Sequence, residues 1–304
     1  MVHSRCSWPG EQMKKYLLIV LVALLVAATV LEAGCTSSTS GQTLQLAGST
    51  TVQPDAQALA QAYMANNTNV KVNVEGGGTA SGITAVGTGT AQIGDASANL
   101  TASQTQQYPN LQPHPICVDG IAIIVSPQNP VGNLTMNQLR GIYTGNITNW
   151  NQVGGSNAPI SVVNREQGSG TRDGIQKIVL NGGNFSTGGI QQSSAGGVKT
   201  TVAGNPNAIG YVGVNEIDST VKAVSINNVA PTYNNIANGS YVIQRYLLFV
   251  TNGSPTGVTA DFINYTLSPA GQAILKAQGE VSLNDVAGYS SATATAAATA
   301  SAAM

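Results

Sequence analysis

The chain has 304 residues, of which 42% are hydrophobic and 8% are charged, and its formal net charge is −1. This length and apolar content suit one large or two medium lobes with real cores, which excludes wholesale disorder. The near-zero net charge argues against a nucleic-acid partner. The chain has two histidines, His3 and His114, and this small number argues against catalysis by an imidazole group and against a zinc site.

The first segment has the pattern of an export leader with a lipid anchor. Met13, where we expect translation to begin, and two lysines precede an apolar run over residues 16–31, as in a signal peptide. That run is short for a membrane-spanning helix, which needs about 20 apolar residues. Residues 31–35 (Leu-Glu-Ala-Gly-Cys) resemble a lipobox, so residues 13–35 are interpreted as signal peptide and lipobox, with Cys35 lipidated. Glu32 replaces the usual aliphatic residue, which leaves open an uncleaved N-terminal anchor.

Residues 36–43 are expected to form a flexible polar tether, and the folded part to begin near Leu44. We expect strands at residues 44–47, 70–74, 93–94, 121–125, 160–163, 208–212 and 241–250. We expect helices that begin near Pro54, Ser81, Thr135 and Thr171, and over residues 258–267 and 271–278. This alternation predicts an α/β sandwich with a mostly parallel sheet. Residues 112–115 (Gln-Pro-His-Pro) are interpreted as a loop, and residues 290–304 as a low-complexity tail.

Three segments share one local design, in which a turn rich in Gly, Ser and Thr stands at the start of a helix. They are residues 48–51 (Gly-Ser-Thr-Thr), 78–82 (Gly-Thr-Ala-Ser-Gly) and 168–172 (Gly-Ser-Gly-Thr-Arg). A helix start carries free N–H groups and partial positive charge, glycine lets the backbone approach a ligand, and hydroxyls add neutral donors. Ordinary helix capping explains any one turn, but three together indicate a site for a compact anion.

Arg165 and Arg172 flank the third turn. A guanidinium group matches the geometry of an oxyanion and keeps its charge at every relevant pH. The alternative interpretation is that the two arginines form ion pairs at the protein surface, with Glu166 and Asp173 as their partners. The turns have neither P-loop nor Gly-x-Gly-x-x-Gly spacing, which favours a small anion over a nucleotide. The three cysteines match no metal-binding spacing, so neither a metal nor a cofactor is expected.

With these segments identified, the chain resembles the phosphate-binding proteins of the phosphate-specific ABC transporter, which have the type II periplasmic-binding-protein fold. The similarity runs from about residue 44 to about residue 283. Its most specific piece is residues 165–172 (Arg-Glu-Gln-Gly-Ser-Gly-Thr-Arg), and residues 48–51, 76–83, 119–122, 139–150 and 208–212 support it.

The resemblance implies two α/β lobes joined by two crossover strands, near residues 119–126 and 241–250, with the ligand in the cleft between them. Lobe 1 would comprise residues 44–122 and 246–289, and lobe 2 residues 123–245. On the first lobe it implies ligand-binding roles for Ser49, Thr50, Thr51, Thr79, Ser81 and Ser97. On the second lobe it implies them for Arg165, Ser169, Gly170, Thr171 and Arg172.

The residues that would select phosphate depart from the family pattern. Many members have a carboxylate where Gln167 stands, and some also have one where Ser97 stands. A carboxylate accepts the proton of hydrogen phosphate and repels fully ionised sulfate. Selection of phosphate over sulfate would therefore depend on Asp95, Glu166, the side-chain oxygen of Gln167 or backbone carbonyl groups. Otherwise it would be weaker than is usual in the family. Asp119 either orients an arginine or simply forms an Asp-Gly turn.

The expected function is capture of inorganic phosphate outside the cytoplasmic membrane and its delivery to the permease subunits of an ABC importer. The protein would be a monomer, held at the outer face of the membrane by its lipid or N-terminal anchor, without enzymatic activity and without a nucleic-acid partner. One alternative is a receptor for sulfate, molybdate or tungstate. A second is a phosphoester-binding enzyme, which the lack of a recognisable nucleophile–histidine pair disfavours. A third is a surface adhesion or matrix protein, suggested by the polar, Asn-rich composition.

Overall fold

The computed structural model describes residues 41–289, and the structural statements below refer to these residues. The predicted signal peptide with Cys35 and the predicted tail over 290–304 lie outside them. So does most of the predicted tether, whose last two residues, Gln42 and Thr43, already belong to the first strand. None of the helices within residues 41–289 combines the length and the apolar composition needed to cross a bilayer.

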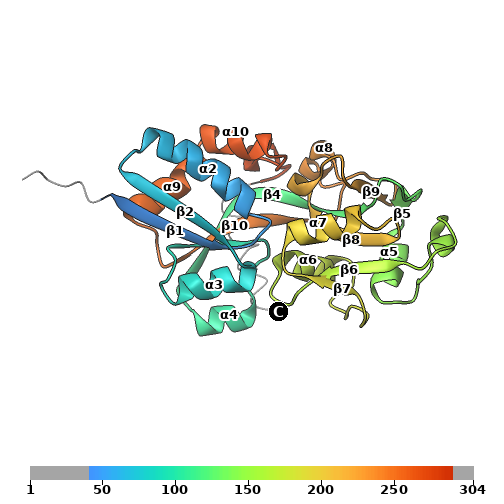
Figure 1. Cartoon of the computed structure of the whole chain (residues 1–304). Helices are drawn as coiled ribbons and strands as arrows, with labels where there is room; N and C mark the ends of the chain where they lie inside the picture. The colour runs from blue at the N-terminus through green and yellow to red at the C-terminus, as the bar shows by residue number, and fades with distance from the viewer. Residues whose placement is uncertain (1–40, 290–304) are drawn as a thin grey trace, which may run out of the picture. The chain divides into compact units, whose positions relative to one another are not determined.

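The described chain forms two halves, each with strands covered by helices (Figure 1). The first half contains β1 (Gln42–Gly48), α2 (Gln53–Asn66), β2 (Val70–Gly76), α3 (Thr79–Gly87), β3 (Ile93–Ala96), α4 (Ala102–Gln107), β10 (Gln244–Asn252), α9 (Gly257–Leu267), α10 (Pro269–Ala277) and η3 (Leu283–Asp285). The second half contains β5 (Asn133–Leu134), α5 (Met136–Tyr143), η1 (Trp150–Val153), β6 (Ser161–Arg165), α6 (Gly170–Ile178), β7 (Ile190–Gln192), α7 (Ala195–Ala203), β8 (Ala208–Gly213), η2 (Val214–Glu216), β9 (Lys222–Ile226) and α8 (Tyr233–Ala237).

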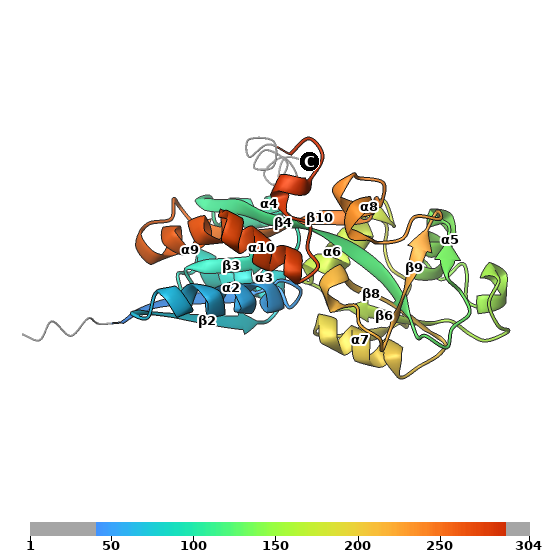
Figure 2. The ribbon, with the colours of Figure 1, turned by 90° about the horizontal axis from the view of Figure 1, so that it is seen from above.

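One long strand, β4 (Leu111–Val125), connects the two halves. Its first part runs antiparallel to β10, and its last five residues run antiparallel to β8. The strand order is therefore continuous, β2-β1-β3-β10-β4-β8-β6-β7. Figure 2 shows β4 running from one half into the other. Residues 116–125 of β4 are all buried, as expected for a strand covered on both faces.

The sheet is mixed, so the α/β class is confirmed but the prediction of a mostly parallel sheet is wrong. Strand β1 is parallel to β2 and β3, and β6 is parallel to β7 and β8. The long central strands differ, because β10 is antiparallel to β3 and β4, and β4 is antiparallel to β8 and β9. Parallel pairing thus dominates the outer parts, and antiparallel pairing joins the halves.

The prediction of a loop over residues 112–115 is also wrong, because these residues lie inside β4. Pro113 pairs in register with Val250, and Pro115 with Leu248. Among the described strands, β10 alone pairs with this part of β4, so the strand has a free edge there. Proline lacks an N–H group and is tolerated where a strand has such an edge.

Helices on both faces of each sheet close separate cores. In the first half, α2, α9 and α10 pack on one face around Leu44, Leu59 and Phe262, and α3 packs on the other face. In the second half, α7 covers β6 and β8 on one side. The larger cluster around Trp150 and Tyr211 fills the other side. Each half is thus a packed unit, and the polar groups described next lie where the two units meet.

Candidate functional site

Five buried hydroxyl side chains gather where the two halves meet. Ser49 Oγ donates to Ser97 Oγ at 2.9 Å, and Thr79 Oγ1 lies 3.3 Å from the same Ser97 atom. Thr51 Oγ1 lies 3.1 Å from Thr171 Oγ1, which belongs to the second half. We call these five side chains the hydroxyl cluster. All are buried, so the cluster is a dry set of neutral donors.

The start of α6 closes on this cluster from the second half. Ser169 caps the helix, as its side chain accepts from the N–H of Arg172 at 3.4 Å. At Gly170, an added Cβ would lie 2.6 Å from Thr79 Oγ1 and 2.7 Å from Ser97 Oγ. Only glycine lets the backbone come this close, so the N–H-rich end of α6 touches the first half directly.

Two further helix starts border the cluster. The helix α3 begins at Thr79, and the N–H of its second residue, Ala80, donates to the carbonyl of Gly168 at 3.0 Å. The helix α7 begins at Ala195, whose N–H donates to Thr50 Oγ1 at 3.2 Å. Helix α7 was not predicted from the sequence, although residues 193–197 (Ser-Ser-Ala-Gly-Gly) are rich in Ser and Gly like the three turns identified there.

Arg165 lies at the end of β6, beside the start of α7. Its Nη2 donates to Glu166 Oε1 at 2.9 Å and to the carbonyl of Ser193 at 3.3 Å, and its Nε donates to Glu166 Oε2 at 3.2 Å. Glu166 faces Gly78 of the first half, since a Cβ on that glycine would lie 3.6 Å from Glu166 Oε1. The predicted ion pair with Glu166 exists, but Arg165 is only 2% exposed, so the surface interpretation fails for it.

Two predicted ligand residues, Arg172 and Ser81, and one predicted proton acceptor, Gln167, lie apart from the cluster. The guanidinium of Arg172 lies over the Phe185 ring at 4.2 Å, and its Nη1 donates to the Arg165 carbonyl at 3.0 Å, so it supports the loop from behind. Ser81 is exposed and donates to the Gly77 carbonyl at 2.7 Å. It follows Thr79 by two residues, about 200° around the helix, and therefore points away. Gln167 is exposed as well.

Asp119 orients an arginine, Arg245, which was not among the predicted site residues. Its Oδ2 accepts from Nη2 of Arg245 at 2.8 Å and from Nε at 3.1 Å, and its Oδ1 accepts from the N–H of Val214 at 3.0 Å. The buried pair links β10 of the first half with β4, the strand that runs between the halves. A buried charge pair of this geometry fixes how those strands lie.

Two more buried carboxyl groups lie near this ion pair. Asn215 Nδ2 donates to Asp55 Oδ2 and to the carbonyl of Thr51, both at 3.2 Å, which ties this region to the hydroxyl cluster. Glu280 is fully buried, and within residues 41–289 neither of its carboxylate oxygens has a hydrogen-bond partner. Burial first, and nearby Asp119 second, raise the pKa of Asp55 and of Glu280 well above their usual values.

The described residues contain no group of three or more His, Cys, Asp and Glu side chains arranged to hold a metal ion.

Asp95 is the fourth buried carboxyl group. It lies on β3, where successive residues point to opposite faces of the sheet. Gly94 packs against α3, so the side chains of its neighbours Ile93 and Asp95 lie on the face away from α3. Neither of its oxygens has a partner in the described part of the chain. Burial raises the pKa of Asp95 to about 8. At neutral pH it is protonated, so it adds no negative charge beside Ser49 and Ser97.

We expect Asp95→Asn to flatten the pH dependence of stability. The folded protein keeps a proton on Asp95 up to about pH 8, whereas the unfolded chain loses it near the ordinary value of 3.8. Between these values the folded state binds more protons, so the free energy of unfolding falls as pH rises, by about 1.4 kcal/mol per pH unit. Urea unfolding at pH 5, 7 and 8 measures this. A slope equal in variant and wild type would contradict a protonated Asp95.

Comparison with known proteins agrees with this architecture. The model of the PBP superfamily domain matches residues 33–270. The phosphate-binding protein PstS of Bacillus subtilis is 32% identical over 285 residues, which is 88% of this chain and 95% of that protein. PstS of Borreliella burgdorferi is 30% identical over 273 residues, 86% of this chain and 97% of that protein.

Solved structures give the same result. A phosphate ABC transporter substrate-binding protein from Clostridium perfringens with bound phosphate has a TM-score of 0.76 and 36% identity, and covers 79% of this chain and 99% of that one. An ABC-type phosphate transport receptor from Vibrio cholerae has a TM-score of 0.66 and 33% identity, over 78% and 99% of the two chains. The chain belongs to the PstS phosphate-binding protein family, within the PBP superfamily.

Proposed function

We propose that this protein captures inorganic phosphate between its two halves and delivers it to an ABC importer. The observation that carries the proposal is the meeting of the hydroxyl cluster with the starts of α3, α6 and α7 at one buried place. Free N–H groups, helix dipoles and hydroxyls are donors, and a small oxyanion is the ligand that accepts from many donors at once. Relatives named for phosphate binding support the choice of anion.

The ligand-binding residues in this proposal are those of the hydroxyl cluster together with Thr50, Arg165, Ser169 and Gly170. Contacts across the halves, such as Ala80 to Gly168 and Thr51 to Thr171, describe a closed arrangement. Closure excludes water, and the donors then attract an anion more strongly than they would in a polar solvent. An importer that docks the closed form better than the open form would couple capture to delivery.

Selection of phosphate over sulfate is assigned to groups that can accept the proton of hydrogen phosphate. Glu166 supports this assignment, because it borders Gly78 and is held by Arg165. The hydroxyl oxygens of the cluster are further acceptors. Asp95 is excluded from the role of an ionised acceptor at neutral pH, because it holds its own proton below about pH 8.

Thermal unfolding of the full chain in phosphate, sulfate, molybdate or buffer alone tests the proposal. Phosphate at 100 times its dissociation constant is expected to raise the free energy of unfolding by roughly 2.7 kcal/mol, since it binds the folded state alone. Equal concentrations of sulfate are expected to give a smaller shift. A melting temperature that no anion moves would overturn the proposal, and a larger shift with sulfate or molybdate would reassign the ligand.

The remaining parts of the proposal concern the setting of the protein. We assign lobe 1 to residues 44–122 and 246–289 and lobe 2 to residues 123–245, which the passage of β4 from one sheet to the other supports. The protein acts as a monomer at the outer face of the membrane, anchored through Cys35, and binds phosphate without turnover. Labelling of cells with a palmitate analogue tests the anchor, because Cys35→Ser should abolish the label. Release of a chromophore from a phosphate ester would contradict the absence of turnover.

A further inference from the structure

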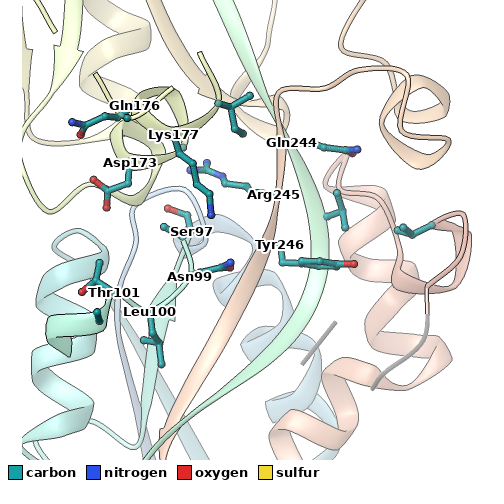
Figure 3. Close-up of a pocket in the computed structure, with 17 residues that line it drawn as sticks. Ser97, Asn99, Leu100, Thr101, Asp173, Gln176, Lys177, Gln244, Arg245 and Tyr246 are labelled. Carbon is teal, nitrogen blue, oxygen red and sulfur yellow. The ribbon is translucent and has the colours of Figure 1, made fainter. Parts of the chain in front are cut away.

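Two cavities in the described part of the chain have similar volumes but differ in charge. The first, of about 810 Å³, lies beside Ser97 (Figure 3), and its wall includes the charged residues Asp173, Lys177 and Arg245. The second, of about 800 Å³, is lined by the end of α5 and the chain after it, by the start of β6 and by the chain that leads into β7. None of the described residues that line this second cavity has a charged side chain. We call it the neutral cavity.

The wall of the neutral cavity suits an uncharged ligand that carries hydroxyl groups. Ile147 and Ile190 offer apolar contact, while hydroxyl and amide side chains offer both donors and acceptors of hydrogen bonds. A sugar combines hydroxyl groups with apolar C–H faces, so it matches both parts of this wall. The volume is within the range of about 300–1,000 Å³ that is usual for sites of small organic ligands. The hydroxyl and amide side chains belong to Thr144, Thr148, Ser161, Ser186, Asn205 and Asn207.

The neutral cavity borders an uncovered edge of the sheet. Strand β7 pairs with β6 on one side, and no other described strand pairs with it. Ile190, the first residue of β7, is 42% exposed. Proteins usually cover or blunt such an edge, because its free N–H and C=O groups can pair with another chain. A saccharide in the cavity would cover this place.

Saccharides become attached to exported proteins at the asparagine of an Asn-x-Ser/Thr triplet. The enzyme must reach the asparagine and the hydroxyl group of the third residue, so an accessible triplet has both exposed and lies outside helices and strands. Within residues 41–289, two triplets meet this condition, those of Asn146 with Thr148 and of Asn238 with Ser240. The others do not: Asn66, Asn133, Asn252 and Asn264 lie in helices or strands, Asn99 is half-buried, and so is Ser186 in the triplet of Asn184.

Asn146 stands on the rim of the neutral cavity. Its neighbours Gly145 and Ile147 both line the wall. Its Nδ2 donates to Thr144 Oγ1 at 3.1 Å, and Thr144 is a wall residue too. The amide nitrogen is the atom that bonds to a sugar, so a sugar attached there starts at the mouth of the cavity. The triplet of Asn238 follows α8 and contributes no residue to this wall.

We propose that Asn146 carries an N-linked glycan whose first sugars lie in the neutral cavity. In the transfer, Nδ2 attacks the anomeric carbon of a sugar carried on a lipid phosphate. A C–N bond forms, the bond from that carbon to a phosphate oxygen breaks, and the lipid phosphate leaves with the electron pair. Nδ2 releases one proton and keeps its other hydrogen, so the hydrogen bond to Thr144 can persist. The inference requires export of the chain but is independent of phosphate binding.

Mass spectrometry of the full chain, isolated from the cells that naturally produce it, tests the attachment. We expect the peptide that contains Asn146 to carry the mass of a glycan. Asn146→Gln and Thr148→Val should both lose this mass, since the second variant keeps the asparagine but removes the hydroxyl group that the enzyme recognises. Thr148→Ser should keep it. Asn238→Gln is the matched control, because it removes the other accessible triplet, and should leave the glycan on Asn146 in place.

Hydrogen exchange over residues 187–190 tests where the glycan lies, because this segment lines the neutral cavity. Exchange there should be at least about threefold slower in the glycosylated wild type than in Asn146→Gln, since a covering sugar protects backbone N–H groups from water. Exchange over residues 238–240, which lie elsewhere, should be equal in the two proteins. Equal exchange over residues 187–190 would show that the glycan does not occupy the cavity.

The remaining outcomes separate this inference from the proposed function. A bare Asn146 in the wild type, or a glycan on Asn238 in its place, would overturn the inference. Retention of the glycan by Thr148→Val would overturn it as well. The proposed function would stand in each case, because it is measured by phosphate binding. Asn146→Gln should bind phosphate as tightly as the wild type, since Asn146 is not among the proposed ligand residues.

Discussion

Replacing Arg165 with alanine is expected to weaken phosphate binding by roughly two orders of magnitude. Arg165 is the buried arginine at the end of β6, directly before the turn that starts α6. Hydrogen bonds to a charged group contribute about 1.5–3 kcal/mol, and each 1.4 kcal/mol is tenfold in affinity. The loss also leaves Glu166 without the guanidinium that neutralises it, which adds repulsion of the anion.

Calorimetric titration of phosphate into variant and wild type measures the effect of Arg165→Ala. Arg140→Ala is the matched control, because Arg140 lies on α5 and donates to the Val179 carbonyl, away from the cluster. It should keep the wild-type affinity. Unchanged affinity in Arg165→Ala, with both variants folded, would remove Arg165 from the site.

Gly170→Ala is expected to weaken phosphate binding roughly 5- to 150-fold by holding the halves apart. The new Cβ would lie 2.6 Å from Thr79 Oγ1 and 2.7 Å from Ser97 Oγ and from the Ser97 carbonyl carbon. Contacts this short are relieved only by backbone movement, and overpacking of a tight site costs about 1–3 kcal/mol. That cost falls on the closed form, because the contacts join Gly170 of one half to residues of the other.

Gly132→Ala provides the control for this variant. Gly132 lies in the second half, and an added Cβ there meets nothing within 4 Å. We expect it to bind phosphate as the wild type does. Urea unfolding should show that Gly170→Ala stays folded, since alanine is a better helix former than glycine. Tight binding by Gly170→Ala would mean that phosphate does not require contact between α6 and the first half.

Local composition predicted the parts of the site that depend on backbone shape. A turn of Gly, Ser and Thr before an apolar helical stretch is a local signal, and the helix starts at Thr79 and Gly170 lie as that signal indicates. The same signal stands before Ala195 and could have identified α7. The strands that carry these turns followed from alternation and apolar runs, within a few residues at their ends.

The direction of side chains could not be read in the same way. Arg172 is near the site in sequence but packs on Phe185, while Arg245 is distant in sequence and faces the cavity beside Ser97. The direction of each arginine side chain depends on how the strands of the two halves are arranged on either side of β4. That arrangement belongs to the tertiary structure and has no local sequence signal. Glu280 is similar, because a glutamate is expected on the surface and only the fold shows it to be buried.

A crystal structure of the full chain grown with inorganic phosphate tests the central claim most directly. We expect tetrahedral density enclosed by the Ser49, Thr51, Ser97 and Thr171 hydroxyls and by the N–H groups at the start of α6. Density for phosphate on an outer surface alone, with those hydroxyls still bonded to one another at saturating ligand, would contradict it.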